Sequence, residues 1–343
     1  MQAYTYGPLY YEGKAANVNA TWETATKENL AFEFKVINKL NIEIDLFKER
    51  RTGILMTRGN TTPKWFGQQA PDANIGETKS HGYEILLKWR DNVGTDFSYF
   101  VSTFVTFNEN RVVFRDDPPN RVDYQRAAGK PISTNYYLLN PDLQRSWDDV
   151  YAYTASAWEN TSRMPGDLAY IDFNADGLID EIDYAPVRLD EIPAYSATTN
   201  LGVTYKNFSL AANFNGVWGT RKRLNGEILW GTDWPESLDR WTPETAETAD
   251  RPRNDGTIQK HNRQNSTYGI QNAAFLRLKS AEFSYNVHKA FLERFGASAC
   301  TIFVNGNNLF TISNFDSRVD PEAANTQAYP LLKRYNIGFR LSF

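Results

Sequence analysis

The chain has 343 residues, a formal net charge of −4 and a single cysteine. This length suits one large β-domain, so it does not require a division into two domains. The balanced charge argues against a nucleic-acid binder, and one cysteine excludes a disulfide scaffold. Aromatic residues make up 14% of the chain, yet no apolar run is long enough for a transmembrane helix. The first residues also lack the basic and apolar regions of a signal peptide.

Alternation of apolar and polar residues predicts nine β-strands, because successive side chains of a strand point to opposite faces. In chain order, their patterns run from Glu23 to Val36, Ile42 to Leu46, Tyr83 to Trp89, Phe97 to Phe107, Leu201 to Tyr205, Phe208 to Trp218, Phe283 to Val287, Ile302 to Val304 and Tyr335 to Phe343. The stretches from about Arg50 to Ser80, Asn110 to Tyr195, Trp218 to Tyr268 and Thr311 to Tyr329 are predicted loops.

The last strand ends on an aromatic residue, Phe343, after apolar residues at every second position from Tyr335. Outer-membrane barrels end in this way because an aromatic ring fits the periplasmic interface. A transmembrane β-strand needs about 9–11 residues and exposes every second one to lipid, so average hydropathy stays low.

The connections alternate between short turns and long loops, which places all short turns at one end of the strands. Outer-membrane barrels have this arrangement, with short periplasmic turns and long extracellular loops. We therefore predict an all-β fold, an antiparallel transmembrane β-barrel with long extracellular loops. Bacterial single-chain barrels have even strand numbers, so an odd count of nine leads us to expect a C-terminal fragment of a larger barrel. Such a fragment leaves two unpaired sheet edges, and we expect it to be unstable alone.

Two alternatives belong to other functional classes. A surface β-sandwich module could bind carbohydrate through aromatic residues, but the faces opposite the apolar stripes carry Glu43, Asp45, Glu84, Lys88 and Arg340. A polar lumen explains these side chains better than a sandwich interior. A glycoside hydrolase would need two carboxylates facing across a cleft, and no sequence pattern indicates such a pair. We expect no enzymatic activity.

Several motifs, in order along the chain, resemble the SusC/RagA family of TonB-dependent outer-membrane transporters. They are Ala20–Glu23 with Lys27–Asn29, Pro165–Asp180, Tyr205–Leu210, Phe275–Lys279, Asn307–Phe310 and the ending from Tyr329 to Phe343. Each motif is weak alone, but together they are specific and span nearly the whole chain. The family's barrel has about 22 strands around a plug, as large transporter barrels do.

The resemblance implies that residues 1–343 are the C-terminal portion of such a barrel, without the plug, the carboxypeptidase-like domain or the signal peptide. It implies nutrient import across the outer membrane of a Gram-negative, Bacteroidota-like bacterium, with glycan or peptide as the ligand. The implied partners are a SusD-like surface lipoprotein, outer-membrane lipid, and TonB–ExbB–ExbD acting through the N-terminal part of the transporter. No residue of this sequence is assigned to energy coupling.

The segment Asp172–Asp183 matches the spacing D-x-N-x-D-G, which is typical of calcium-binding loops. Oxygen ligands for a structural Ca²⁺ would come from Asp172, Asn174, Asp176, the Leu178 carbonyl, Asp180 and Asp183. The alternative is a turn stabilised by Asn and Asp side chains, and the sequence does not decide between the two. No other cofactor is expected.

Aromatic residues concentrate in the two longest loops, and Trp147, Trp158, Trp230 and Trp234 are the candidate ligand-binding residues. They could stack on sugar rings or on peptide side chains, whereas loop packing is the alternative for any one of them. The three histidines, His81, His261 and His288, lie in separate segments without a metal or catalytic spacing. We therefore expect all three to be solvated.

Overall fold

The computed structural model describes residues 13–58, 65, 70–158, 162–190, 192–224, 229, 239–253, 260–292, 296–323, 328–329 and 331–343. The chain divides into two compact units. One consists of residues 1–28, 47–81 and 109–132, and the other of residues 29–46, 82–108 and 133–343.

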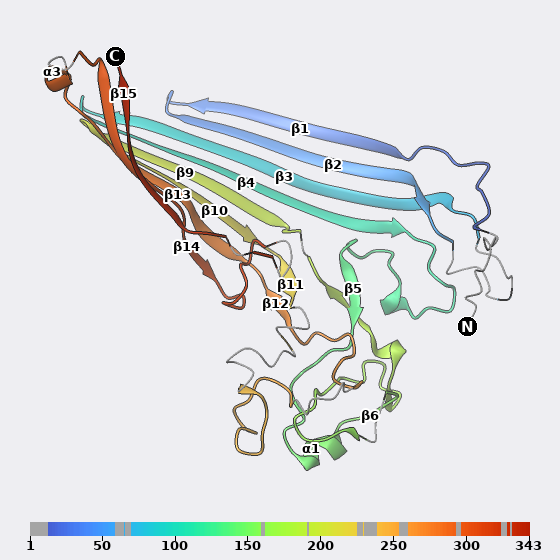
Figure 1. Cartoon of the computed structure of the whole chain (residues 1–343). Helices are drawn as coiled ribbons and strands as arrows, with labels where there is room; N and C mark the ends of the chain where they lie inside the picture. Colours follow the sequence, from blue (N-terminus) through green and yellow to red (C-terminus); the bar gives the residue numbers. More distant parts are fainter. Residues whose placement is uncertain are drawn as a thin grey trace, which may run out of the picture. The chain divides into compact units, whose positions relative to one another are not determined.

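Among the described residues, nine strands form one sheet in the order β1-β2-β3-β4-β9-β10-β13-β14-β15, which confirms the predicted number (Figure 1). They are β1 (Thr24–Val36), β2 (Leu40–Met56), β3 (Ala73–Val93), β4 (Phe97–Phe114), β9 (Tyr195–Tyr205), β10 (Phe208–Trp218), β13 (Phe275–Asn286), β14 (Ala299–Ser313) and β15 (Arg334–Ser342). From β9 onward each strand follows its sequence neighbour in the sheet order, as expected for antiparallel strands joined by turns and loops.

The long connections contain short elements that the sequence pattern did not predict. Antiparallel pairs join β5 (Thr134–Tyr137) to β8 (Ala185–Arg188) and β11 (Arg221–Arg223) to β12 (Ile270–Asn272), and β6 (Ala155–Ser156) pairs in parallel with β7 (Leu178–Ile179). Helical segments include α1 (Trp147–Ala152), α3 (Lys289–Leu292) and the 3₁₀ helices η2 (Asp123–Gln125) and η4 (Glu181–Asp183). Among the described residues, no helix has the length and apolar character needed to cross a membrane.

One face of the sheet in the second unit carries two rows of apolar side chains that continue from strand to strand. Register places Tyr99, Val203, Leu210, Phe283, Val304 and Ile337 in one row and Phe97, Tyr205, Phe208, Tyr285, Ile302 and Phe339 in the next. Leu210 and Phe283 are 50% and 49% exposed, and Ile337 is 79% exposed. A β-sandwich would bury this face against a second sheet, so the sandwich alternative is wrong.

The opposite face of the same strands is polar and is linked by hydrogen bonds between neighbouring strands. Asn213 donates to the side-chain oxygen of Asn200 at 2.7 Å. Asn336 donates to Asn305 at 2.8 Å, and Asn305 donates to Glu282 at 3.1 Å. Each bond joins side chains on adjacent strands, so this face has the polar character predicted for a barrel lumen.

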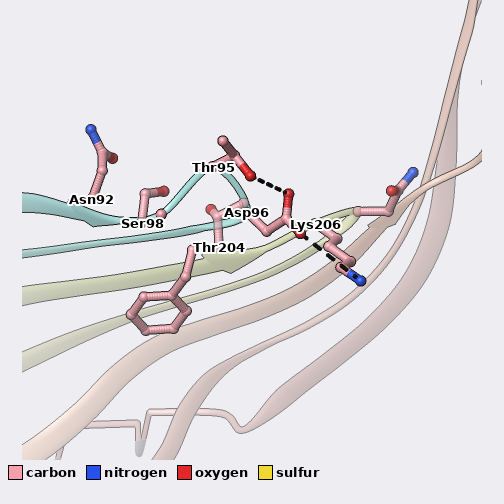
Figure 2. A pocket seen from close by; sticks show the side chains of 9 residues that line it. Asn92, Thr95, Asp96, Ser98, Thr204 and Lys206 are labelled. Atoms are coloured by element: carbon pink, nitrogen blue, oxygen red, sulfur yellow. Dashed lines mark hydrogen bonds and ion pairs between the residues drawn. The ribbon is translucent and has the colours of Figure 1, made fainter.

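The short connections of the second unit join consecutive antiparallel strands and alternate with the long connections, so they all lie at the same end of the strands. The turn between β1 and β2 uses Ile37 and Asn38, both with positive φ (53° and 54°), a backbone that matches the twist of a hairpin. Figure 2 shows the neighbouring turns of β3–β4 and β9–β10, where Lys206 forms an ion pair with Asp96 at 4.0 Å beside a hollow of about 610 Å³. The predicted alternation of short and long connections is confirmed.

Several strand ends differ from the prediction, most clearly in the first unit. The stretch from Arg50 to Ser80 was expected to be a loop, but β2 continues to Met56 and β3 begins at Ala73. Here the alternation of apolar residues stops while the strands continue, because charged side chains pair between strands. Lys48 contacts Glu28 at 2.8 Å and Arg50 contacts Glu77 at 2.7 Å.

A glycine on the polar face allows close packing between two strands. Gly202 of β9 lies opposite Phe100 of β4, and the Phe100 ring covers it so closely that a Cβ at residue 202 would overlap the ring. We predict that Gly202→Val lowers the stability of the folded protein by about 1–3 kcal/mol, the usual cost of overpacking. The measurement is the urea midpoint of the detergent-solubilised protein, followed by heat-modifiable gel mobility.

The double variant Gly202→Val with Phe100→Ala should recover most of this loss, because the overlapping ring is gone. Ala211→Val is a matched control, since Ala211 pairs with Gly202 on the same face. A Gly202→Val defect that persists without the Phe100 ring would contradict the explanation.

Candidate functional site

The two longest connections pack together in the second unit and form a body with its own hydrophobic core. Leu138 donates its backbone N–H to the carbonyl of Asn265 at 2.9 Å and accepts from the N–H of Thr267 at 2.9 Å. Five buried residues make up the core: Leu138, Leu143, Leu168, Tyr170 and Ile179. Because Leu138 and Leu168 are completely buried, these loops are ordered by the same burial of apolar surface that orders a small domain.

A buried carboxylate connects the two loops. Asp167 is 1% exposed and accepts hydrogen bonds from Arg253 Nε at 2.7 Å, Asn262 Nδ2 at 2.8 Å and the backbone N–H of Met164 at 2.8 Å. Asp167 belongs to the connection between β4 and β9, whereas Arg253 and Asn262 belong to the connection between β10 and β13. The charged pair is therefore satisfied by several donors, as a buried ion pair requires.

His261 lies beside this pair and corrects the expectation that all three histidines are solvated. It is 2% exposed, and its Nε2 is 2.8 Å from the carbonyl oxygen of Leu168. Tyr170 donates its hydroxyl to the carbonyl of His261 at 2.7 Å. Burial lowers the pKa of His261, despite the opposing effects of the Leu168 carbonyl and Asp167, so the neutral imidazole is favoured. His81 and His288 are exposed, as expected.

The last long loop, which joins β14 to β15, is held by a basic residue of β13. Arg277 is 1% exposed and donates to Asp320 at 2.6 Å and to Glu322 at 2.9 Å, and Lys279 contacts Glu322 at 2.9 Å. The alternation of side chains along the strand predicts only that Arg277 and Lys279 share a face. Their acidic partners lie more than 40 positions away, so no local pattern reveals these contacts.

The four candidate tryptophans differ in exposure, and two of them lie outside the described residues. Trp147, on α1, is 51% exposed and lies 6.2 Å from the ring of Tyr151, which is 81% exposed. Trp158 is half-buried and packs on the hydrophobic core with Tyr184, 6.1 Å away. Trp230 and Trp234 lie outside the described residues. Of the two candidates in the described part, only Trp147 presents an exposed ring, and the neighbouring Tyr151 adds a second ring on which a ligand could stack.

The start of α1 fixes the position of this aromatic pair. The Ser146 hydroxyl accepts from the backbone N–H of Asp149 at 3.2 Å, and the Asp149 carboxylate accepts from the backbone N–H of Ser146 at 2.9 Å. This reciprocal capping box satisfies two backbone donors at the helix start. Trp147 and Tyr151 are four residues apart on the helix and therefore share one face.

The acidic segment folds as a compact turn in which its side chains accept backbone N–H groups. Asp172 accepts from Gly177 at 2.8 Å, Asp176 accepts from Leu178 at 2.9 Å, and Asp180 accepts from Ile182 at 2.7 Å. Asp183 is fully buried and accepts from Phe173 at 2.7 Å and from Asp180 at 2.8 Å. In the described part of the chain, no group of three or more His, Cys, Asp or Glu side chains is placed to hold a metal ion.

The chain was compared with known protein families, and the model described as "TonB dependent receptor-like, beta-barrel" matches residues 1–217. This chain belongs to that family. The sheet with one apolar and one polar face is thus part of a TonB-dependent receptor barrel, which confirms the predicted fold class and family.

Its relatives include two TonB-dependent receptors from Bacteroidota genera. TonB-dependent receptor P26 of Formosa agariphila is 27% identical over 336 residues, covering 91% of this chain and 32% of the relative. SusC of Bacteroides thetaiotaomicron is 24% identical over 354 residues, covering 99% of this chain and 34% of the relative. The chain therefore spans about a third of the length of these receptors.

Among solved structures, the RagAB peptide importer in its open-open state shares the fold. The TM-score is 0.72 at 19% identity, and the match covers 96% of this chain and 36% of that one. A second structure, the RagAB peptide transporter, gives a TM-score of 0.70 at 20% identity.

The ion pair of Asp167 with Arg253 leads to a prediction about the loop body, the unit formed by the packed β4–β9 and β10–β13 connections of this TonB-dependent receptor segment. Asp167→Asn leaves the Arg253 guanidinium without a carboxylate in a buried site, which costs about 3–5 kcal/mol. Hydrogen exchange of residues 138–170 should become faster, because the two loops separate more often. Asp148→Asn is the matched control, since Asp148 is exposed on α1 of the same loop. Unchanged exchange in Asp167→Asn would contradict the proposed role of the pair.

The acidic segment Asp172–Asp183 was predicted either to bind calcium or to form a turn without metal, and a calcium titration distinguishes the two. Calcium binding predicts one calorimetric transition per protein, and its affinity should fall in Asp172→Asn and Asp176→Asn. If the turn binds no metal, CaCl₂ should produce no heat of binding. Asp172→Asn should still loosen the segment, because Asn keeps only one of the two oxygens that accept from the backbone N–H groups of Asp176 and Gly177.

Proposed function

We propose that this chain forms barrel wall and ligand-binding loops of a TonB-dependent importer in the outer membrane of a Gram-negative, Bacteroidota-like bacterium. The observation that carries the proposal is the exposed apolar face opposite a polar, hydrogen-bonded face, in a chain of the TonB-dependent receptor family. Lipid suits the first face and a watery or plugged interior suits the second. No residue is proposed to perform chemistry.

The proposed ligand is an oligosaccharide or a peptide. The peptide class is supported by the name of one similar solved structure, the RagAB peptide importer. The oligosaccharide class is supported by the resemblance to the SusC/RagA family. In this chain, the exposed rings of Trp147 and Tyr151 suit either ligand, since they can stack on sugar rings or on apolar peptide side chains.

The proposed partners are a SusD-like surface lipoprotein, which would close the loop side, and the TonB–ExbB–ExbD system, which would supply energy. The pairing with a lipoprotein is supported by the family resemblance and by the loop body, whose packed core could present a fixed surface to a partner. Co-purification of the protein with such a lipoprotein tests the pairing.

The function is tested by uptake in a strain that lacks the gene. We expect loss of import of fluorescent oligosaccharides or oligopeptides, restoration by the gene supplied in trans, and no restoration in a strain without TonB. Replacing Trp147 and Tyr151 by Ala should weaken ligand binding about tenfold, the loss expected when two stacking rings are removed.

Ile192→Ala is the matched control for this pair, because Ile192 is an apolar loop side chain that is 85% exposed. Binding should be unchanged in this variant. Equal binding by the wild type and the Trp147 and Tyr151 variant would reject the stacking site, whereas import that needs neither the gene nor TonB would reject the proposed function.

A further inference from the structure

The exposed face of α1, which lies within the second unit, combines two aromatic rings with a carboxylate. On the helix surface, Tyr151 is a neighbour of Trp147, four positions before it, and of Asp148, three positions before it. Asp148 is exposed and makes no hydrogen bond or ion pair with the described residues. A ligand that reaches the two rings therefore also meets a negative charge that the described part of the chain does not neutralise.

The two arginines closest to α1 in sequence are used inside the loop body. Arg145 donates from Nη1 to two backbone carbonyls of the β10–β13 connection at 2.7 and 3.0 Å, and from Nε and Nη2 to Asp142 at 3.1 and 2.8 Å. Arg163 is 7% exposed and donates to the carbonyls of Val150 and Thr154 at 3.1 and 3.0 Å. Both guanidinium groups thus hold the loop body together, which leaves them few donors for an anionic ligand.

Carboxylates outnumber cations around this helix. α1 has two acidic residues in its first turn and no basic residue in its last turn. The hydrogen bond to Asp142 raises the pKa of Arg145, and the charges of Glu247 and Asp149 act in the same direction. One guanidinium thus lies within electrostatic range of three carboxylates, and Asp148 adds a further negative charge beside them. This excess of negative charge favours a cationic group on the ligand.

The aromatic rings favour the same kind of group, because the face of an aromatic ring attracts a cation placed over it. The ring centroids of Trp147 and Tyr151 are 6.2 Å apart, with an angle of 30° between the ring planes. A guanidinium group is planar, stacks on aromatic faces and pairs with a carboxylate. A neutral sugar could stack on the same rings but would make no use of the charge on Asp148.

We propose that the face formed by Trp147, Asp148 and Tyr151 binds an arginine side chain of a peptide ligand. The guanidinium stacks on the two rings, and the Asp148 carboxylate accepts its hydrogen bonds. The site rests on the proposed function, since it requires that the loop body meets the imported ligand. It narrows that ligand from an oligosaccharide or a peptide to a basic peptide.

The test compares two hexapeptides that differ only in charge, one with two arginines among alanines and one with citrulline in their place. Citrulline keeps the length and planar end of the arginine side chain but is neutral. Binding of each fluorescent peptide to the detergent-solubilised protein is measured by anisotropy. We expect the arginine peptide to bind about tenfold more tightly, the combined effect of a cation over exposed rings and an exposed ion pair. High salt should reduce this ratio.

Substitutions divide this preference between the carboxylate and the rings. Asp148→Asn should lower the ratio of arginine-peptide to citrulline-peptide affinity about threefold, because the amide carries no charge. Trp147→Leu should also lower it about threefold, since leucine keeps an apolar surface but lacks a ring face. Asp148→Glu should retain most of the preference, because the negative charge remains on the same face of the helix.

The matched control is Asp96→Asn, which removes the same charge from the short turn between β3 and β4. This turn lies at the opposite end of the strands from the long connections, so the ratio should be unchanged. Equal binding of the two peptides by the wild type would overturn the proposal, and so would equal reductions of the ratio in Asp148→Asn and Asp96→Asn. Binding of neutral oligosaccharides without binding of either peptide would also overturn it.

Heat-modifiable gel mobility and import of both peptides are recorded for the wild type and for every variant. Import that requires the gene and TonB but does not prefer the arginine peptide rejects this site and leaves the proposed function intact. Import that needs neither the gene nor TonB rejects the proposed function itself.

Discussion

Backbone hydrogen bonds between neighbouring strands determine which side chains share a face, and the other features of this chain depend on that register. Leu210 pairs with Val203 on one side and Phe283 on the other, so three strands contribute to one apolar row. A shift of a single residue would turn every apolar side chain to the polar face. Since one face is then apolar and the other is a hydrogen-bonded polar surface, the proposed recognition of a ligand is left to the connections.

The long connections can carry recognition only if they are held in place without help from the sheet faces. They achieve this with a separate core around Leu138 and Leu168 and with the Asp167 carboxylate between two loops. Such a body loses less conformational entropy on binding than a flexible loop of the same length, because the ordering has been completed during folding. The exposed rings of Trp147 and Tyr151 are therefore presented on a short capped helix that the loop body supports.

The sheet could be predicted from the sequence because a strand's period of two is a local signal. Phe208, Leu210, Phe283 and Val304 reveal their face without knowledge of their partners. The loop body has no such period. Its contacts join Asp167 to Arg253 and Arg277 to Asp320 over 86 and 43 positions, and only the folded chain brings them together. For the same reason the sequence could not separate exposed Trp147 from half-buried Trp158, nor show that His261 is buried.

The difference between the predicted and the observed ends of β2 and β3 has a geometric cause. β3 has 21 residues, which at about 3.3 Å per residue extend about 70 Å, whereas the apolar band of an outer-membrane barrel is about 25 Å tall. Even a strand tilted by about 45° would rise well beyond such a band. Apolar alternation must therefore end long before the strand does, and the remainder is stabilised by pairs such as Arg50 with Glu77. In such a strand the apolar alternation is limited to the length that would contact lipid, whereas the length of the strand is set by backbone pairing.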